Sequence, residues 1–430
     1  MDKNEMAVFW FRRDLRLDDN TGLIRALESG LPVLPLFIFD EFILDDLPED
    51  DARVTFIYRQ LEKIHRKLEQ AGSGLMIKKG KPLAVWKDMT AEFTIKKVFF
   101  NKDYEPYART RDQKVIELLL SKGIAVYTSK DQVIFEKDEI LKEDGTPYTV
   151  YTPYKNKWLD HFKKIRISSD ERHTGLSGFV KHNTDFPGLE SIGFKESGIG
   201  VPDYKLNVMD DYGKNRDFPA RDHTSHLSTH LRFGTVSIRK LVKLAAQKDP
   251  TFLSELIWRE FFMQILYHFP KVVTKNFKSQ YDGIKWRNDE IEFEKWCRGE
   301  TGYPMVDAGM RQLNTTGLMH NRVRMITAGF LCKHLLIDWR WGEAYFAKKL
   351  LDYELAANNG NWQWAAGTGC DAAPYFRIFN PTAQMEKFDK DLEYVMKWVP
   401  EFRSADYKPI VKHPFARQRA IDTYKAGLKR

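Results

Sequence analysis

Short apolar runs alternate with amphipathic stretches over the first 130 residues. The runs predict five strands, at Ala7–Phe11, Val33–Phe39, Leu75–Ile77, Val98–Phe100 and Ile124–Tyr127. Between them, apolar residues recur at helical spacing over Ala52–Ala71 and Thr110–Lys122, and a glycine follows each stretch. Short strands that alternate with helices predict a parallel sheet covered by helices on both faces. We therefore expect a Rossmann-like α/β domain over residues 1–130.

The pattern changes twice along the rest of the chain. Residues 131–205 contain an aromatic, lysine-rich stretch at Tyr148–Trp158 and a stretch rich in Gly, Ser and Pro at Ser168–Pro202, which predicts an interdomain linker. Residues 206–430 return to helical spacing, which predicts an all-α domain with helices at Ile238–Ala246, Phe252–Phe269, Pro304–Thr315, Asn321–Leu336 and Trp341–Leu351. We expect four glycines to mark loops in this domain, at Gly317, Gly360, Gly367 and Gly369.

Composition narrows the class of protein. Lys and Arg exceed Asp and Glu by eight, so a basic surface that attracts phosphate polyanions is expected. No apolar run is long enough to cross a membrane, and the first residues do not resemble a secretory signal, so we expect a cytoplasmic protein. The three cysteines, Cys297, Cys332 and Cys370, are far apart, which favours free thiols over a disulfide framework or a metal site.

The residues after the first strand argue against a common dinucleotide site. A Rossmann fold that binds NAD carries a G-x-G-x-x-G turn there, whereas this chain has the charged run Arg12–Leu17. The predicted fold is therefore Rossmann-like without support for NAD binding.

One predicted helix carries an unusual mixture on a single face. Glu255, Trp258, Arg259 and Phe262 lie at offsets of 0, 3, 4 and 7, so they share a stripe. An ion pair over an aromatic ring would explain the stripe. A pocket wall that stacks on a planar ligand and anchors phosphate would explain it equally.

A second helix presents two arginines in opposite directions. Arg322 and Arg324 are two residues apart, or about 200° around a helix. Asn321 shares a face with Arg324, and Met325 shares one with Arg322. The helix would contact a buried cofactor on one side and a polymer on the other, although surface salt bridges would also account for each arginine.

Two further segments carry candidate ligand-binding groups. The run Thr224–Ser228 precedes a predicted helix, where its hydroxyls would either cap the helix or hold phosphate oxygens. The segment Asp352–Pro381 places the amide of Asn358 and the indoles of Trp362 and Trp364 close together. The residues alone predict an aromatic pocket for a planar, phosphate-bearing ligand, and no reaction.

At these residues the sequence resembles the DNA photolyase/cryptochrome family, most closely a class I cyclobutane pyrimidine dimer photolyase. The opening VFWFRRDLRLDDNTGL resembles the first strand and loop of the family. The flavin domain is matched by RDFPARDHTSHLSTHLRFGTVS, ELIWREFF, TGYPMVDAGMRQLNTTGLMHNRVRMITAGFLCKHLLIDWR and NNGNWQWAAGTGCDAAPYFRIFNP. The resemblance spans nearly the whole chain.

The resemblance implies an N-terminal antenna domain and a C-terminal helical domain that holds FAD. It implies light-driven repair, in which reduced FAD donates an electron to a cyclobutane pyrimidine dimer that is flipped out of ultraviolet-damaged DNA. By motif, the phosphates and ribityl chain would contact Tyr212, Thr224, Ser225, His226, Leu227 and Ser228. The flavin ring would be surrounded by Asn321, Arg324, Asp352, Tyr353, Glu354 and Asn358, with Arg324 and Asp352 as an ion pair and Asn358 facing N5.

The same resemblance assigns roles toward the lesion and the DNA. Glu255 would hydrogen-bond the dimer, Trp258 and Trp364 would stack around it, and Met325 would lie beside it, so that Glu255, Asn358 and Met325 form the catalytic set. The DNA backbone would meet Arg216, Arg259, Arg322 and Arg377. Electrons that photoreduce FAD would pass along Trp362, Trp339 and Trp286.

Some positions depart from the family pattern. His226 stands where many members have arginine, and Glu354 where aspartate is frequent. Tyr107-Ala108 replaces the Asn-Glu pair of folate-binding relatives, which argues against a folate antenna and leaves deazaflavin, FMN or no second chromophore open.

Three other functions fit parts of the pattern: a cryptochrome photoreceptor, a (6-4) photolyase and a basic nucleotide-binding module. Asn358 favours a photolyase, since plant-type cryptochromes tend to have aspartate there and animal-type ones cysteine. Asn321 and Met325 differ from the (6-4) histidine pair. We expect a monomer that binds damaged DNA and no membrane.

Overall fold

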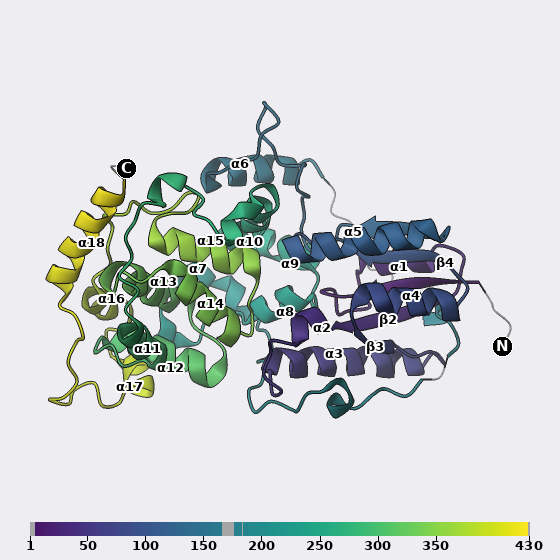
Figure 1. Cartoon of the computed structure of the whole chain (residues 1–430), viewed down its shortest axis with the longest axis horizontal. Coiled ribbons are helices and arrows are strands. Elements are labelled where there is room, and N and C mark those ends of the chain that lie inside the picture. The colour runs from purple at the N-terminus through teal and green to yellow at the C-terminus, as the bar shows by residue number, and fades with distance from the viewer. Residues whose placement is uncertain (1–4, 166–175, 183, 429–430) are drawn as a thin grey trace. The chain divides into compact units, whose positions relative to one another are not determined.

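The computed structural model describes residues 5–165, 176–182 and 184–428 (Figure 1). Part of the Gly-, Ser- and Pro-rich stretch within the expected linker lies outside these residues. Packing groups the chain into two compact units. The first contains Met1–Glu139, Phe162–Tyr204 and His226–Gln247, and the second contains Ile140–His161, Lys205–Ser225 and Lys248–Arg430. The expected boundaries at residues 130 and 205 stay a prediction, because packing does not report which segments fold independently.

The first unit is built on a five-stranded parallel sheet, as expected. Its strands are β1 (Met6–Phe11), β2 (Val33–Asp40), β3 (Met76–Gly80), β4 (Ile95–Asn101) and β5 (Ala125–Ser129). Their spatial order is β3-β2-β1-β4-β5, with Phe9 of β1 opposite Pro35 of β2 and Phe99 of β4. All five expected strands form, and their ends lie within three residues of the expected ones.

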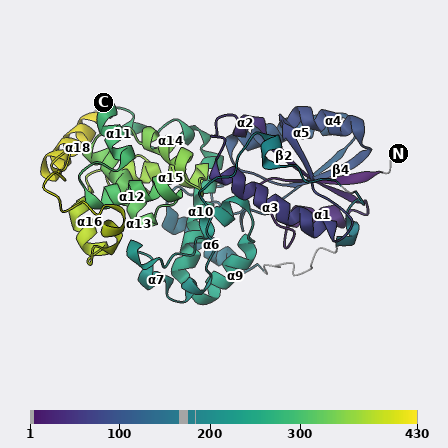
Figure 2. The ribbon, with the colours of Figure 1, turned by 90° about the horizontal axis from the view of Figure 1, so that it is seen from below.

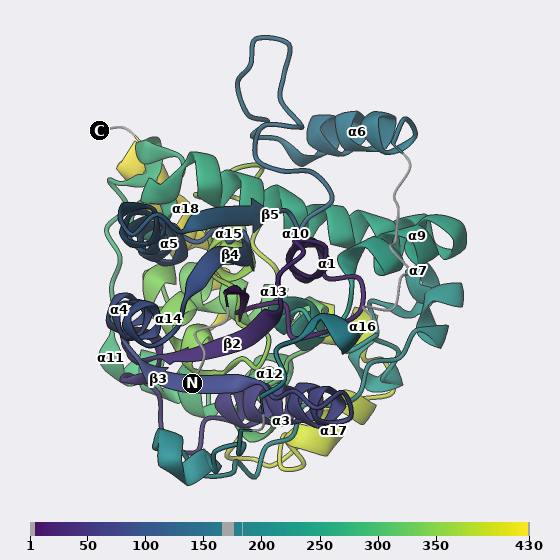
Figure 3. The ribbon, with the colours of Figure 1, turned by 90° about the vertical axis from the view of Figure 1, so that its right-hand side faces the viewer.

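Side chains of β1 alternate between two cores, one on each face of the sheet. Phe9 and Phe11 are buried against helices α1 (Thr21–Leu27) and α3 (Ala52–Glu69), whereas Trp10 is buried against α4 (Pro82–Glu92) and α5 (Pro106–Ser121). Figures 2 and 3 show these two helix layers on opposite sides of the strands. The helices of this unit are α1 (Thr21–Leu27), α2 (Glu41–Leu44), α3 (Ala52–Glu69), α4 (Pro82–Glu92), α5 (Pro106–Ser121), α8 (Leu227–Phe233) and nearly all of α9 (Ile238–Lys248).

Charged residues meet at the carboxyl ends of β1 and β4, where the strand order reverses. Open α/β sheets commonly bind ligands at such a point. Here Arg13 pairs with Asp103 at 3.2 Å and with Glu105 at 3.1 Å, while Arg12 pairs with Asp112. Burial opposes ionisation of Asp103, but the Arg13 guanidinium beside it lowers its pKa. The protein's own ion pairs therefore occupy the charged run after β1.

The second unit is helical. Its helices are α6 (Tyr151–Phe162), α7 (Tyr212–Asn215), α10 (Pro250–His268), α11 (Glu290–Arg298), α12 (Pro304–Thr316), α13 (Asn321–Gly329), α14 (Trp339–Lys349), α15 (Leu355–Ala366), α16 (Pro381–Phe388), α17 (Glu393–Trp398) and α18 (His413–Leu428). Short 3₁₀ turns join several of them. All five helices that the sequence predicted after residue 206 are present, four of them in this unit and one, α9, in the first unit. One of the four is shorter than expected.

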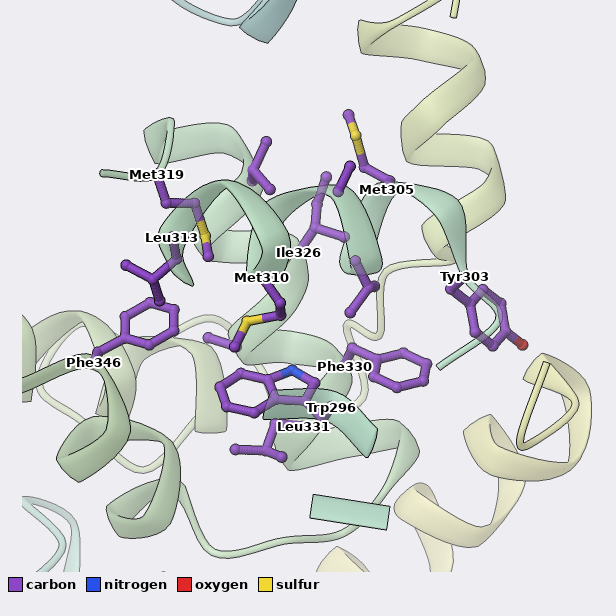
Figure 4. Packing of buried hydrophobic residues seen from close by; sticks show 14 of the residues in the cluster. Trp296, Tyr303, Met305, Met310, Leu313, Met319, Ile326, Phe330, Leu331 and Phe346 are labelled. Carbon is purple, nitrogen blue, oxygen red and sulfur yellow. The ribbon is translucent and has the colours of Figure 1, made fainter. Parts of the chain in front are cut away.

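The core of the second unit surrounds a buried indole (Figure 4). Trp296 is 0% exposed, and its Nε1 donates a hydrogen bond to the carbonyl of Thr327 at 3.1 Å. Met310, Phe330 and Leu331 belong to the same buried cluster. A satisfied indole N–H allows this large ring to be buried without a polar cost.

Two expectations for the helical unit are wrong. The predicted helix Asn321–Leu336 is α-helical only to Gly329, and Phe330–His334 forms a π-helical turn. Gly360 lies inside α15 instead of marking a loop. A Cβ at Gly360 would lie 2.9 Å from Cγ of Phe262 and closer to two other ring atoms, so the glycine serves close packing against α10.

The cysteines and the helices of the described residues can be checked for disulfides, membrane spans and metal sites. Cys297, Cys332 and Cys370 are free thiols. Among the described residues, no helix is both long and apolar enough to span a membrane, and no cluster of three or more His, Cys, Asp or Glu side chains could hold a metal ion.

Candidate functional site

Three helices of the second unit, α10, α13 and α15, carry most of the candidate residues. Helix α15 packs against both α10 and α13, and also against α14 (Figure 1). Glu255, Trp258 and Arg259 project from α10, and Asn358 and Trp364 from α15. Residues that lie about 100 positions apart in the sequence are thus brought to adjoining helices.

The expected ion pair between Arg324 and Asp352 is present. Arg324 Nη2 donates to both carboxylate oxygens of Asp352, at 2.9 and 3.2 Å, and its Nε donates to the carbonyl of Met319 at 2.8 Å. The Asp352 side chain is only 6% exposed. The bonds from Nη2 to Asp352 and from Nε to Met319 together fix the orientation of the guanidinium. Asn321, at the start of α13, is exposed, and Tyr353 is half-buried.

The amide of Asn358 is oriented by a residue that the sequence reasoning missed. Its Nδ2 donates to the backbone carbonyl of Glu343 at 3.1 Å and to Oε1 of the same residue at 2.9 Å. Burial raises the pKa of the Glu343 carboxyl. Because both amide hydrogens have acceptors on α14, Asn358 has its carbonyl oxygen left to accept a hydrogen bond from a ligand.

Glu255 is held by a neighbouring arginine. Arg216 Nη1 donates to Oε1 of Glu255 at 2.6 Å, and the guanidinium lies 5.4 Å from the ring centroid of Tyr212. Burial, followed by the nearby Glu255 charge, raises the pKa of Tyr212 to about 12. The structure therefore joins three residues that the sequence analysis had assigned separately to the cofactor, the DNA and the lesion.

The two arginines of α13 have separate partners, as their opposed directions require. Arg322 pairs with Asp217 at 2.7 Å, donates to Sδ of Met325 at 3.8 Å and lies 4.3 Å above the ring of Phe388. His320 accepts a hydrogen bond from the backbone N–H of Arg322 at 3.2 Å. Burial lowers the pKa of His320 to about 4, so the imidazole is neutral at pH 7 and able to accept.

The other residues expected at the DNA differ in exposure. Arg259 lies 3.4 Å from Glu354; the Glu354 side chain is buried, and that of Arg259 is 12% exposed. Arg377 is exposed in the loop between α15 and α16, and Trp364 is half-buried. The DNA contact of Arg259 stays a prediction, and its pairing with Glu354 ties it to a residue expected at the cofactor.

Trp258 stacks on a residue that the sequence analysis had placed in the linker. The rings of Tyr151 and Trp258 lie parallel, with centroids 3.6 Å apart and 9° between the planes. Tyr151 begins α6, which packs in the second unit. The aromatic stretch Tyr148–Trp158 was visible in the sequence, but its offsets of three and four residues between aromatics were the only sign of a buried helix face.

The three indoles expected to carry electrons differ in depth. Trp362 and Trp339 are 2% and 1% exposed, whereas Trp286 is half-buried and meets the ring of Tyr424 edge-on at 5.9 Å. Trp339 Nε1 donates to Asn276 Oδ1 at 2.9 Å. Trp362 meets Trp296, which no motif singled out, at 6.1 Å. The order of the indoles along an electron path stays a prediction.

The run expected to hold phosphate is divided between the two units. Thr224 and Ser225 end a segment of the second unit, and His226, Leu227 and Ser228 begin a segment of the first. Helix α8 starts at Leu227, after His226 adopts a left-handed φ of 53°. Such a conformation is uncommon for a residue with a side chain, and it sets the direction in which the helix begins.

The polar groups of the second unit suit a flavin. A flavin ring needs hydrogen-bonding partners at its pyrimidine edge and at N5, and an apolar or aromatic bed elsewhere. The partly buried Arg324–Asp352 pair offers both donors and acceptors, and Asn358 offers an acceptor. Trp362 of α15 belongs to the aromatic core of the second unit.

Comparison with known proteins agrees with this assignment of chemistry. Residues 7–172 match the model of the DNA photolyase family, and residues 252–428 match the model of the FAD binding domain of DNA photolyase. A deoxyribodipyrimidine photo-lyase of Halobacterium salinarum is 38% identical over 433 residues, which cover 93% of this chain and 90% of the relative. The chain belongs to the DNA photolyase family.

Two solved photolyase structures are similar to this photolyase-family chain along its length. A bacterial class III photolyase from Agrobacterium tumefaciens is 34% identical, with a TM-score of 0.87 over 100% of this chain and 99% of its own. An archaeal photolyase from Sulfolobus tokodaii, described with two FAD molecules, is also 34% identical, with a TM-score of 0.87 over 98% of this chain and 100% of its own. The photolyase fold expected from the sequence is thus confirmed.

Proposed function

We propose that this protein is a deoxyribodipyrimidine photolyase that uses FAD and light to split cyclobutane pyrimidine dimers in DNA. The observation that carries this proposal is the packing of α10, α13 and α15 in a unit that matches the FAD-binding domain of the family. The candidate lesion residues Glu255 and Trp258 lie on α10, and the candidate flavin residues Arg324 and Asn358 lie on α13 and α15, and α15 packs against both other helices. When bound, the flavin supplies the light-absorbing electron donor.

The residues around the flavin position would hold it and orient its ring. Arg324 and Asp352 form a fixed pair that would hydrogen-bond the polar edge of the ring. Asn358, whose amide nitrogen is engaged by Glu343, would accept a hydrogen bond from the N5–H of reduced flavin. An acceptor at that point favours the protonated form of N5, because a protonated nitrogen is a donor.

Glu255, Trp258 and Trp364 would receive the flipped lesion. Glu255 is 33% exposed and already accepts a hydrogen bond from Arg216 at 2.6 Å, so its second oxygen would accept one from the dimer. Trp258 and Trp364 would stack on the pyrimidine rings. Extrusion is cheapest for a lesion that is already poorly stacked, which gives selectivity for damaged DNA.

The proposed activity predicts light-dependent repair by the purified protein. Flavin-loaded protein, reduced chemically, is mixed with an oligothymidylate that carries cyclobutane dimers, and thymine absorbance is followed under blue light. We expect absorbance to return only in the light. Because Asn358 distinguishes photolyases from cryptochromes in the family pattern, the variant Asn358→Asp serves as a comparison.

Two outcomes would contradict the proposal. Flavin-loaded protein that repairs no cyclobutane dimer would favour the cryptochrome alternative, in which light drives signalling without repair. Repair of (6-4) photoproducts in place of cyclobutane dimers would favour the (6-4) alternative.

We further propose that the first unit holds a second chromophore with a flavin-type ring. The ring of Tyr107 stacks on Phe42 at 4.6 Å and 12°, and Phe42 is 68% exposed. Tyr107 also donates a hydrogen bond to Asp40, the last residue of β2, at 2.7 Å. This pair is an accessible aromatic platform at the carboxyl edge of the sheet, where α/β folds bind ligands. The Sulfolobus relative with two FAD molecules supports the flavin type.

Chromophore extraction tests this assignment. We expect protein saturated with FAD and FMN, then desalted and denatured, to release more flavin than one molecule per chain. Phe42→Ala should remove the excess and leave the repair flavin in place, because Phe42 belongs to the first unit. Release of a folate, or of a single flavin from both proteins, would contradict the proposal.

A further inference from the structure

An aromatic group on α6 and α10 has one member with accessible surface. Tyr151 is 5% exposed, and Phe261 and Phe262 are likewise buried, whereas Trp258 is half-buried. Phe261 and Phe262 meet the Trp258 ring at 5.6 and 5.4 Å, inclined to it, and only Tyr151 lies parallel to it. Tyr151 therefore covers one face of Trp258 from inside the protein, and the accessible surface of the group belongs to Trp258.

Both ends of Tyr151 are anchored. Its hydroxyl donates to the backbone carbonyl of Ser254 at 2.7 Å, one helical turn before Trp258. Its backbone N–H donates to Oδ2 of Asp371 at 3.1 Å, in the loop that leads to Arg377. The hydrogen bond to Ser254 therefore fixes the Tyr151 ring against the turn of α10 that precedes Trp258. The two rings cannot slide past one another without breaking this hydrogen bond.

The helix that carries Tyr151 is itself fixed to α10. Tyr154 and Trp158, three and seven residues after Tyr151, lie on the same buried side of α6. Trp158 Nε1 donates to Oε1 of Glu260 at 2.7 Å, and the Tyr154 hydroxyl donates to the same oxygen at 3.3 Å. A buried carboxylate that accepts two such bonds is costly to separate from its donors. Helix α6 is therefore a rigid support for the Tyr151 ring.

We propose that Tyr151 is a positioning residue for lesion binding, and that α6 belongs to the DNA-repair site through it. This inference rests on the proposed photolyase function, in which Trp258 stacks on the flipped pyrimidines. Tyr151 holds the Trp258 ring in the orientation that the lesion meets. A tryptophan without this backing samples several rotamers in the free protein and must be ordered when the lesion enters, which weakens binding without removing any contact with DNA.

The test compares three variants of the full flavin-loaded chain. Tyr151→Leu removes the ring, Tyr151→Phe keeps the ring without the hydroxyl, and Tyr127→Leu is the control. Tyr127 also stacks on a buried ring, that of Phe99 at 4.9 Å and 16°, but it lies on β5 of the first unit. Affinity is measured for an oligonucleotide with one cyclobutane dimer and for the same oligonucleotide undamaged, at several salt concentrations.

We expect Tyr151→Leu to bind the damaged oligonucleotide about three- to tenfold more weakly, the size expected for ordering one large side chain on binding. Its affinity for undamaged DNA and its salt slope should match those of the unmodified protein, because no phosphate contact is lost. The affinity of Tyr151→Phe for the damaged oligonucleotide should lie between those of the unmodified protein and Tyr151→Leu. Tyr127→Leu should bind as the unmodified protein does. Repair per bound dimer should be unchanged in all of them.

Two results would overturn the inference. Unchanged lesion affinity in Tyr151→Leu would mean that Trp258 needs no backing, and tighter binding would mean that the Tyr151 ring occupies the place of the lesion. If Tyr151→Leu does not fold, Tyr151→His replaces it. Its smaller planar ring should cover less of Trp258, so its affinity for the damaged oligonucleotide should fall by less than expected for Tyr151→Leu. Unmodified protein that shows no preference for the dimer would refute the proposed function itself, which separates the two failures.

Discussion

Replacing Trp362 with phenylalanine is expected to slow photoreduction of the flavin by about tenfold or more, since each ~1.4 kcal/mol added to an activation barrier costs a factor of ten in rate. A benzene ring is far harder to oxidise than an indole, so the electron donor proposed at this position of α15 would be lost. The measurement follows the decay of oxidised-flavin absorbance under blue light with an external reductant. Repair by chemically reduced Trp362→Phe protein should persist, because repair does not draw on that path.

The structure supplies a matched control for this variant. Trp296 is as deeply buried as Trp362 and meets it at 6.1 Å, but the family pattern does not include it in the electron path. Trp296→Phe should therefore photoreduce normally, whereas Trp339→Phe should be slow. Slow photoreduction in Trp296→Phe with normal photoreduction in Trp339→Phe would redirect the path through the core of Figure 4. Unchanged photoreduction in Trp362→Phe would remove Trp362 from the path.

Gly342→Ala is expected to destabilise the protein by about 1–3 kcal/mol or more, the usual cost of overpacking a filled core. A Cβ at Gly342 on α14 would lie 2.6 Å from Cδ2 of Leu331 and closer still to the Trp362 ring. Neither neighbour has room to withdraw, because both are buried. Chemical denaturation of the flavin-loaded protein, followed by circular dichroism, gives the free energy of unfolding.

A second helical glycine separates this packing effect from helix propensity. Gly329, the last residue of α13, has helical angles, and a Cβ there would meet only Phe379, at 3.8 Å. Gly329→Ala should therefore stabilise the protein by about 0.5–1 kcal/mol, since alanine is the better helix former. Equal effects of the two substitutions would mean that the approach of Trp362 to α14 is not close.

Local pattern was enough to predict most of the secondary structure. The alternation of β1, with Phe9 and Trp10 facing opposite cores, follows from the two-residue period of a strand. The stripe Glu255–Phe262 follows from the period of a helix. The predicted helix Asn321–Leu336 extends beyond the observed α-helix, which ends at Gly329. The π-helical turn Phe330–His334 that follows is set by packing in the core around Trp296, and it does not change the spacing of the hydrophobic residues.

Candidate residues were predicted from the sequence by motif, whereas their partners came only from the structure. The Arg324–Asp352 pair was expected from the family pattern and is present. Nothing in the sequence pointed to Glu343 as the acceptor for Asn358, because the two residues lie on different helices and a hydrogen bond between helices has no periodic signature.

By itself, then, the sequence determined the parallel sheet, the helical unit and the photolyase family, because these depend on periodicity and on long motifs that are local in the chain. Only the tertiary structure decided that Tyr151 of the expected linker stacks on Trp258. It also decided that Gly360 and Gly342 lie inside helices, where neighbouring side chains pack too closely for a Cβ. These features arise where two distant segments approach within van der Waals distance, and the energy of such a contact depends on both surfaces at once.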